Sequence, residues 1–222
     1  MLYLVPTPIG NLQDITLRAL EVLKSVDLIA CEDTRTSSKL LNHFDIRVPR
    51  ISYHDHNERG RTPQLIDQMK AGQRIALISD AGSPGISDPG FYLVRACIEA
   101  EIKVEALPGA TAVIPALTVS GLPSERFVYE GFLPVKKGRQ TRLGQLAEEP
   151  RTMVFYESPH RLLKTLGNFE DTFGPERPAA VVREISKTFE EVQRGPLAEL
   201  KKYFAEKNKL RGEFVIVVGG KR

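Results

Sequence analysis

The sequence predicts an α/β protein made of two α/β domains, and three observations support this fold class. Short apolar runs alternate with segments of helical periodicity along the 222 residues. Turns rich in Gly and Pro follow several of the apolar runs. The segment Gly121-Leu122-Pro123-Ser124 interrupts the alternation where the balance of charged residues changes sign. Strands that alternate with helices form right-handed βαβ units and a mostly parallel sheet, so we expect one domain over residues 1–120 and another over 121–222.

The first predicted domain contains five strands separated by helices. Its predicted strands are Leu2–Val5, Asp27–Cys31, Val48–Ser52, Arg74–Ser79 and Lys103–Leu107. Its predicted helices are one capped by Thr16, Thr34–Phe44, Pro63–Met69, a segment through Tyr92–Glu99, and Thr111–Val119. Thr16 suits an N-cap, because its hydroxyl can accept a first-turn N–H while Leu17, Leu20 and Leu23 share one apolar face.

The second predicted domain has a higher strand content. Its predicted strands are Phe127–Glu130, Thr152–Tyr156, Ala179–Val182 and Phe214–Val218. Its predicted helices are Gln140–Ala147, Arg161–Asn168 and Leu197–Lys207. We therefore expect a second α/β layer after the break at residue 121.

Composition excludes several protein classes. Hydrophobic residues make up 41% and charged residues 27% of the chain, which argues against disorder. No segment approaches the roughly 18 uninterrupted apolar residues of a membrane helix, and the N-terminus lacks the basic segment of a signal peptide, so we expect a cytoplasmic protein. The two cysteines, Cys31 and Cys97, exclude a disulfide framework and a Cys-rich zinc site and are predicted to be small core residues.

The charge is distributed unevenly between the predicted domains. The net charge is +3, with −2 over residues 1–120 and +5 over residues 121–222. Four cations lie within Lys136–Arg142, after Gly131-Phe132-Leu133-Pro134. Cations on a loop neutralise phosphates and release counterions, so this loop is a candidate contact for an RNA backbone; the alternative is a loop that merely aids solubility.

Three Gly- and Pro-rich loops follow strands of the first predicted sheet. They are Pro6–Gly10, Ser79–Gly90 and Leu107–Ala112. Because ligands of open α/β sheets bind beyond the carboxyl ends of the strands, we expect the three loops to meet at one edge and form one pocket. Tight crossover turns are the structural alternative for each single loop. Neither G-x-G-x-x-G nor G-x-x-x-x-G-K-[ST] occurs, which disfavours a dinucleotide site and a P-loop.

Two further polar segments follow strands of the first predicted domain. In Cys31–Arg35, Asp33 fits an N-cap at the start of a helix, whereas Arg35 is a candidate phosphate contact. Ser52–Glu58 contains His54 and His56, but two alternate histidines seldom bind metal without a third ligand. We therefore predict a polar loop that faces the surface or a substrate, and no metal site.

Two charged segments follow strands of the second predicted domain. Phe155–Arg161 carries Glu157, His160 and Arg161, and Pro159 also fits the first turn of a helix. Arg183–Glu191 is dense in paired charges. A solvated face is the structural alternative for this segment, and side chains directed at a pocket are the functional one.

Taken together, the motifs resemble a known family. The sequence is similar to the bacterial small-subunit ribosomal RNA cytidine 2′-O-methyltransferases, within the tetrapyrrole methylase superfamily. The similarity runs in order across about nine-tenths of the chain. The motifs that carry it are Pro6–Thr16, Glu32–Arg35, Asp80–Gly90, Leu107–Ala112, Gly131–Pro134, Tyr156–Arg161 and Arg183–Lys187. Some members carry an extra tail after the last strand, whereas this chain ends at Gly219-Gly220-Lys221-Arg222.

The resemblance implies S-adenosylmethionine (SAM) as the methyl donor, bound in a cleft between the two α/β domains. It also implies a homodimer and no catalytic metal. The residues expected to bind SAM are Pro8, Ile9, Gly10, Asp80, Ala81, Gly82, Ser83, Ile86, Thr111 and Ala112. Small residues at Gly82, Gly85 and Ala112 would permit a close approach to the methyl group.

The expected substrate is the 2′-hydroxyl of a cytidine in the decoding region of 16S rRNA. A ribose hydroxyl is a weak acid, so a positioned base would assist its reaction, and Glu157 and Glu184 are the candidates, with His160 as a lesser option. Lys187 would instead stabilise the alkoxide electrostatically. The residues expected to contact RNA are Arg35, Lys136, Lys137, Arg139, Arg142 and Arg161.

Two alternative functions fit the same fold. One is SAM-dependent methylation of a small tetrapyrrole precursor, which would need a closed apolar basin instead of a basic second domain. The other is a non-catalytic ribosome-assembly factor, which would bind RNA without any dependence on SAM.

Overall fold

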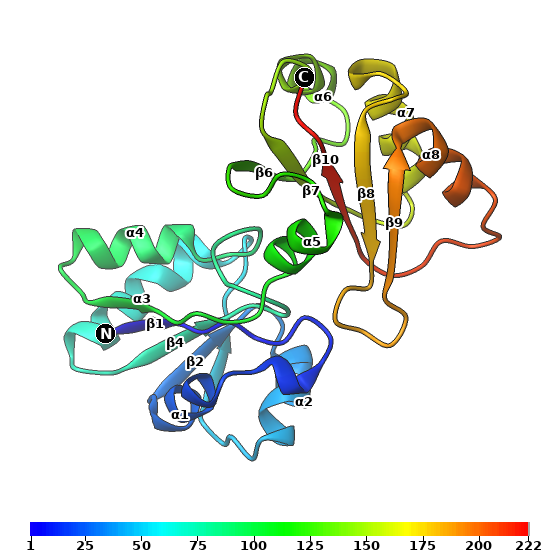
Figure 1. Ribbon diagram of the computed structural model, residues 1–222. Coiled ribbons are helices and arrows are strands. Elements are labelled where there is room, and N and C mark those ends of the chain that lie inside the picture. The colour runs from blue at the N-terminus through cyan, green and yellow to red at the C-terminus, as the bar shows by residue number, and fades with distance from the viewer. Residues whose placement is uncertain (222) are drawn as a thin grey trace. The chain divides into compact units, whose positions relative to one another are not determined.

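The computed structural model describes residues 1–221, which form two compact units (Figure 1). The first unit is Met1–Thr111 and the second begins at Ala112. Each unit is built around one five-stranded sheet, so the predicted α/β fold class is confirmed.

The sheet of the first unit is parallel throughout, as the strand–helix alternation predicts. Its strand order is β3-β2-β4-β1-β5. The strands are β1 (Leu2–Leu4), β2 (Leu28–Cys31), β3 (Arg50–Ser52), β4 (Ile75–Ile78) and β5 (Val104–Ala106). The helices are the 3₁₀ turn η1 (Leu12–Asp14), α1 (Leu17–Ser25), α2 (Thr34–His43), α3 (Glu58–Lys70) and α4 (Phe91–Glu99).

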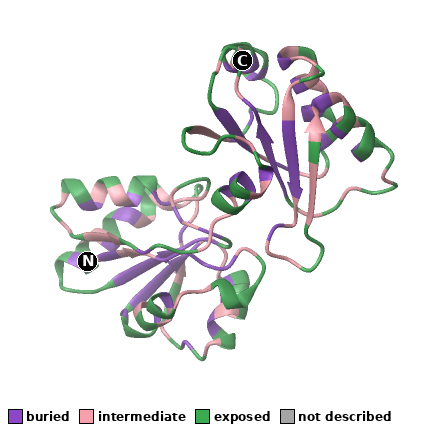
Figure 2. Cartoon of the chain, in the orientation of Figure 1, coloured by how far each residue is buried: buried purple, intermediate pink, exposed green. Residues whose placement is uncertain are grey.

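Helices cover both faces of this sheet, and its central strands are accordingly buried (Figure 2). Along β4, Ala76 and Ile78 pack with the apolar faces of α1 and α2. Ile75 and Leu77 point to the opposite face and pack with α3 and α4. A strand buried on both faces is apolar at every position, which is why Ile75–Ile78 is a continuous apolar run.

Both cysteines lie in the core of the first unit, as predicted. Cys31 and Cys97 have no exposed surface. Burial raises the pKa of the Cys97 thiol to about 11 and also raises the pKa of Cys31. Both thiols therefore stay protonated and act as small apolar groups.

The second sheet is mixed, with strand order β6-β7-β10-β8-β9. Only β6 and β7 pair in parallel, and the remaining pairs are antiparallel. The strands are β6 (Phe127–Phe132), β7 (Thr152–Glu157), β8 (Pro178–Arg183), β9 (Glu191–Pro196) and β10 (Phe214–Val218). The helices are α5 (Val113–Ser120), α6 (Arg139–Leu146), α7 (Leu162–Phe173) and α8 (Leu197–Ala205).

The edge strand β9 was not predicted. Its sequence, Glu-Val-Gln-Arg-Gly-Pro, contains only one large apolar residue and no residue of it is buried. An edge strand pairs on one side only and need not contribute to the core, so the hydrophobic pattern does not mark it.

The core of the second unit lies between the sheet and helices α6, α7 and α8. Phe155 of β7, Phe169 of α7 and Phe204 of α8 are among its fully buried side chains. Burying one such side chain contributes on the order of 1.5–3 kcal/mol. Helix α5 contacts β8, β9 and β10, and it lies beside β10 in Figure 1.

The boundary between the units lies before α5, and not after it as the sequence suggests. The sequence break suggests a boundary at residues 120/121, whereas the contacts divide the chain between Thr111 and Ala112. The sequence places the helix predicted over Thr111–Val119 in the first domain, because the break in the pattern comes after it, at Gly121. The structure has this helix as α5, Val113–Ser120. It belongs to the second unit because its apolar residues pack against strands of the second sheet.

No helix within residues 1–221 has the length and apolar character needed to cross a membrane.

Candidate functional site

The three Gly- and Pro-rich loops of the first unit meet, as predicted, because β4, β1 and β5 are neighbouring parallel strands. Thr7 and Gly82 exchange two backbone hydrogen bonds, each 2.9 Å long, which join the loop after β1 to the loop after β4. The Ser83 hydroxyl donates to the carbonyl of Ala110 at 3.3 Å, which joins the loop after β4 to the loop after β5. The loops that carry the predicted SAM-binding residues therefore form one cluster.

Two glycines allow the loops to approach so closely. Gly82 has φ +83°, a conformation that L side chains rarely adopt. A Cβ added at Gly109 would lie 2.6 Å from Cβ and 2.9 Å from Cγ of Pro6. The rigid Pro6 ring cannot move aside as a flexible side chain would, so only glycine fits at position 109.

Three carboxyl groups form an acidic rim at the carboxyl ends of β2 and β4. This acidic rim is Glu32, Asp80 and Asp88. Burial raises the pKa of all three carboxyl groups. Repulsion between neighbouring acids raises the pKa values further: Asp80 and Asp55 each raise the pKa of Glu32 and that of Asp88. The carboxylate of Asp80 also accepts a hydrogen bond from the backbone N–H of Asp33 at 3.2 Å. A cationic ligand at this rim would relieve the repulsion.

Asp33 caps α2, as the sequence pattern predicts. Its side chain accepts a hydrogen bond from the Arg35 N–H at 2.7 Å. The Arg35 guanidinium pairs with the same carboxylate at 3.2 Å, and its side chain is 91% exposed. Arg35 is therefore accessible, and its role as an RNA contact stays a prediction.

The two histidines of the loop before α3 lie near each other, and one of them is held by Asn57. The ring centroids of His54 and His56 lie 6.0 Å apart. Asn57 holds His54 in place: its Oδ1 accepts from the His54 N–H at 2.9 Å, and its Nδ2 lies 3.1 Å from Nε2 of His54. Among residues 1–221, no three His, Cys, Asp or Glu side chains are arranged to hold a metal ion.

In the second unit, β6, β7 and β8 end at the sheet edge where β10 begins. Glu157, the last residue of β7, is 2% exposed. Its carboxylate accepts hydrogen bonds from the Ser158 N–H at 2.8 Å and the Thr165 hydroxyl at 2.6 Å, and it pairs with Arg161 at 3.3 Å. Glu157 thus has its oxygens occupied inside the unit and fixes the position of Arg161.

Three of the arginines predicted to contact RNA are engaged within the unit. Arg139 is 4% exposed and donates to Asn168, Thr165 and the carbonyl of Pro134. Arg142 binds both carboxylate oxygens of Glu130, at 2.8 and 2.5 Å. Arg161 donates to the carbonyl of Leu133 in addition to pairing with Glu157. Arg139 therefore serves the fold, whereas Lys136 and Lys137 are exposed.

Glu184 and Lys187 form a charged cluster with a residue that the sequence did not single out, Glu213. The Lys187 Nζ donates to Glu184 at 3.0 Å and to Glu213 at 2.8 Å, and the Glu213 N–H donates to Glu184 at 2.9 Å. Glu184 has φ 52° and Ser186 has φ 67°, so the turn after β8 is strained. Strained backbone of this kind persists where the surrounding contacts hold it, and these ion pairs are such contacts.

The cluster keeps both of its predicted catalytic residues charged. Partial burial acts to raise the pKa of Glu184, but the N–H of Glu213 and the Lys187 ammonium outweigh it, and the pKa is lowered. Partial burial acts to lower the pKa of Lys187, but the hydrogen bonds to Glu213 and Glu184 outweigh it, and the pKa is raised. At neutral pH, Lys187 is a cation and Glu184 a weak base.

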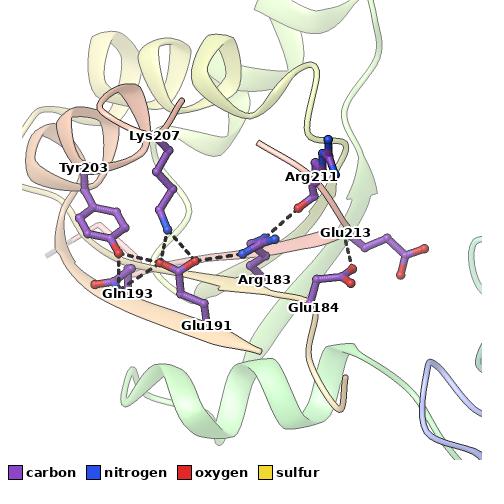
Figure 3. Close-up of polar contacts among 8 residues, drawn as sticks. All are labelled: Arg183, Glu184, Glu191, Gln193, Tyr203, Lys207, Arg211 and Glu213. Carbon is purple, nitrogen blue, oxygen red and sulfur yellow. Dashed lines mark hydrogen bonds and ion pairs between the residues drawn. The ribbon is translucent and has the colours of Figure 1, made fainter. Parts of the chain in front are cut away.

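A second polar network lies beside this cluster and centres on Glu191, the first residue of β9 (Figure 3). Its carboxylate accepts from the Tyr203 hydroxyl at 2.7 Å and from Lys207 at 2.6 and 2.8 Å. Arg183 reaches it at 3.4 Å and donates to the Arg211 carbonyl at 2.8 Å. These contacts tie both ends of the strained turn to α8 and to the segment before β10. Glu191 and Glu213 are far apart in sequence, and strand pairing brings both of them to this region. The sequence alone therefore does not reveal that they belong to these networks.

Comparison with known proteins identifies relatives over the whole chain. A family model described as Tetrapyrrole (Corrin/Porphyrin) Methylases matches residues 1–201. The "Ribosomal RNA small subunit methyltransferase I" of a Synechocystis species is 56% identical over 221 residues, which cover 99% of this chain and 79% of the relative. The protein of the same name from Vibrio cholerae serotype O1 is 53% identical, with 100% and 78% covered.

Solved structures share the fold at low sequence identity. A uroporphyrin-III C-methyltransferase from Thermus thermophilus, complexed with S-adenyl homocysteine, matches with a TM-score of 0.66 and 20% identity over 98% of this chain and 96% of that one. A diphthine synthase matches with a TM-score of 0.74 and 15% identity over 98% and 89%. At these identities the structures support the fold class alone.

The contact between Gly109 and Pro6 leads to a first prediction. Gly109→Ala forces the loop after β5 away from the loop after β1, so the affinity of the protein for SAM should fall at least tenfold in isothermal titration. Gly60→Ala is the matched control, because a Cβ at Gly60 meets nothing within 4 Å and alanine favours the helix α3. Equal affinities for the two variants would contradict a site at these loops.

The acidic rim leads to a second prediction, on pH. An ordinary carboxyl group titrates at about pH 4. Because the pKa values of the acidic rim are raised, the folded unit binds more protons than the unfolded chain at pH values above this range. The stability is then greatest below that range and falls as the pH rises through the raised values. Asp88→Asn should therefore raise the urea midpoint at pH 7 and leave it nearly unchanged at pH 4.

Asp67→Asn on α3 is the matched control for a lost surface carboxylate. A lower urea midpoint for Asp88→Asn at pH 7 would show that Asp88 is stabilised by a partner and is not repelled by its neighbours.

Proposed function

Because the chain belongs to the tetrapyrrole (corrin/porphyrin) methylases, we propose that it is a SAM-dependent methyltransferase of small-subunit ribosomal RNA. The finer proposal is that it methylates the ribose 2′-hydroxyl of a cytidine in the decoding region of 16S rRNA. The observation that carries the proposal is the cluster of three loops, whose motifs are those of the family, in a chain that matches rRNA methyltransferases along its whole length. The proposed homodimer and cytoplasmic location follow from the same resemblance.

The residues at the carboxyl edge of the first sheet fit SAM. SAM carries two positive charges, on its sulfonium and its amino group, and the acidic rim of Glu32, Asp80 and Asp88 is suited to attract them. The backbone of the tightly packed loops offers hydrogen-bonding groups close to a ligand. The residues proposed to hold SAM are Pro8, Ile9, Gly10, Asp80, Ala81, Gly82, Ser83, Ile86, Thr111 and Ala112.

SAM would supply a methyl group on a sulfonium, whose C–S bond would break as the O–C bond forms, to leave a neutral thioether that needs no further activation. The chain therefore has to align the ribose oxygen with the methyl carbon and exclude water. The loops of the first unit orient the donor, and glycine at position 82 lets the backbone approach it. Alignment of this kind can lower the barrier by about 7–11 kcal/mol.

Lys187 and Glu184 act on the ribose hydroxyl. The Lys187 ammonium stabilises the negative charge that develops on the oxygen. Because its pKa is lowered, Glu184 accepts the hydroxyl proton only as the new O–C bond makes that proton acidic. Glu213 holds Lys187 from the other side, at 2.8 Å. Glu157 is buried and paired, and we assign it the positioning of Arg161.

The function is tested by mass-spectrometric mapping of methylated ribose after the protein is incubated with SAM and unmodified small subunits. Wild type should methylate one cytidine, and Lys187→Met should lower kcat roughly 100–1,000-fold with unchanged SAM affinity. Lys201→Met is the matched control, since Lys201 also pairs with a glutamate, Glu170, at 2.6 Å. Transfer to a porphyrinoid precursor but not to the subunit, or RNA binding without SAM dependence, would overturn the proposal.

The position of Glu184 can be tested without changing its charge. A Cβ at Gly212 would lie 2.5 Å from the Glu184 side chain, so Gly212→Ala should displace that carboxylate from Lys187 and lower kcat at least tenfold. Gly174→Ala separates this clash from backbone strain, because Gly174 has φ +94°, close to the +93° of Gly212, with nothing within 4 Å. Equal losses of kcat in the two variants would mean that backbone strain alone matters and that the placement of the Glu184 carboxylate does not affect catalysis.

A further inference from the structure

Three aromatic rings form a row on one face of β6 and β7. Tyr129 contacts Tyr156 with ring centroids 5.4 Å apart and planes at 75°. Tyr156 in turn contacts Phe132, at 5.6 Å and 62°. Tyr156 alternates with Phe155, which points into the core beneath α7, so the row lies on the opposite face of the sheet.

A β-bulge brings Phe132 into this row. The register pairs Tyr129 with Val154 and Gly131 with Phe155, so Glu130 is an extra residue on β6. Gly131 has φ +60°. In a regular strand, residues three apart point to opposite faces, and Phe132 would then face the core side. The bulge reverses this. Bulges are over-represented at sheet edges, where β6 lies, and next to active sites, where they re-aim a side chain.

The Phe132 side chain is mostly exposed within its own unit. Phe132 is the last residue of β6 and is 56% exposed, although Gly131 before it is buried. Its contact with Tyr156 is edge-to-face and leaves more than half of the side chain open to solvent. A single exposed ring is common on protein surfaces, and Phe91 and Phe189 are more exposed. Phe132 differs from an isolated ring in that it ends a row of three aromatic rings.

Cations follow Phe132 closely along the chain. Lys136 and Lys137 are exposed, and neither forms an ion pair within residues 1–221. By contrast, Arg139, Arg142 and Arg161 are held by groups of the unit. An accessible ring flanked by uncommitted lysines combines a surface for base stacking with charges for phosphates.

The ring and the proposed catalytic cluster lie at the same edge of one sheet. Phe132 ends β6 and Glu184 follows β8, with β7 and β10 between them. Neighbouring strands are about 4.8 Å apart, so three steps correspond to about 14 Å. A base that stacks on Phe132 therefore belongs to a nucleotide near the methylated one, and not to the methylated nucleotide itself.

We propose that Phe132 is a stacking platform for an unstacked base of the RNA substrate, next to the nucleotide that is methylated. The proposal rests on the function proposed above and adds a residue that determines how the RNA is held. Bases stack on aromatic side chains through their faces, and sequence-specific proteins commonly recognise splayed bases in single-stranded RNA in this way.

The hollow at the opposite edge of the same sheet is a weaker candidate. It has a volume of about 300 Å³ and is lined by residues that include Leu122, Pro150, Arg151, Pro178 and Lys221. Glu149 holds Arg151 at 2.6 Å, and Glu148 holds Lys221 at 2.5 Å. These charges are therefore already neutralised, and no exposed ring accompanies them.

The platform is tested with Phe132→Ala and the conservative variant Phe132→Tyr. Phe132→Ala should raise the KM for the small subunit about tenfold, leave kcat at saturating subunit within twofold, and leave SAM affinity unchanged. Phe132→Tyr should restore the wild-type KM. An RNA fragment carrying 2-aminopurine beside the target should show quenched fluorescence with wild type and with Phe132→Tyr, but not with Phe132→Ala.

Salt dependence separates stacking from charge. Phe132→Ala should weaken RNA binding without changing the slope of log K against log salt, whereas Lys136→Ala and Lys137→Ala should each reduce that slope by about one. Ile98→Ala on α4 is the matched control for loss of an exposed apolar side chain, since Ile98 is 66% exposed. It should leave RNA affinity unchanged.

The proposal is wrong if Phe132→Ala leaves subunit affinity unchanged, or if it weakens SAM binding instead. Thermal melting of each variant shows whether it is folded. Phe132→Leu keeps an apolar side chain but lacks the ring, so it should behave like Phe132→Ala. Failure of the proposed function itself is seen separately, as absence of methyl transfer by wild type, because the binding and quenching experiments need no transfer.

Discussion

Two backbone hydrogen bonds between Thr7 and Gly82 hold together the loops from which the candidate site of the first unit is built. The Thr7 side chain is 1% exposed, and its hydroxyl donates to the carbonyl of Ser79 at 3.0 Å. The Ser79 hydroxyl donates to the carbonyl of Gly82 at 3.2 Å. The loop after β4 is thus fixed by buried polar contacts at the point where it leaves the sheet. Pre-organisation of this kind lets a site bind a ligand without ordering its loops first.

In the second unit the antiparallel pairing of β10 has the corresponding role. Phe214 pairs with Arg183 on one side and with Glu157 on the other, so the residue before β10 meets the residue after β8. This register brings Glu213 to Glu184 and completes the ion pairs on Lys187. A one-residue slip would turn the alternating side chains of β10 to the wrong faces of the sheet. The buried side chains of β10 therefore determine its register, and the register determines where Glu213 lies.

The sequence predicted the parts of the site that depend on local signals. Parallel strands followed by Gly- and Pro-rich turns imply loops that meet at one edge, and the N-cap at Asp33 follows from residue type alone. The sequence did not predict β9 or the role of Glu213, because these depend on strand pairing between distant segments. It also did not reveal that Arg139 is buried, because that burial depends on Thr165 and Asn168, which lie on another helix. The role of the predicted arginines in RNA binding stays a prediction.

Counting charged residues alone would therefore locate the surface that binds a polyanion wrongly. The cations of residues 121–222 include Arg142 and Lys207, which neutralise buried or half-buried carboxylates of the same unit. An ion pair with its partner already in place gains little from a phosphate, because the new contact must first break the old one. What remains for a long anionic substrate is a smaller set of uncommitted lysines near an exposed ring. Recognition of the substrate should then depend more on shape and stacking than the number of cations suggests.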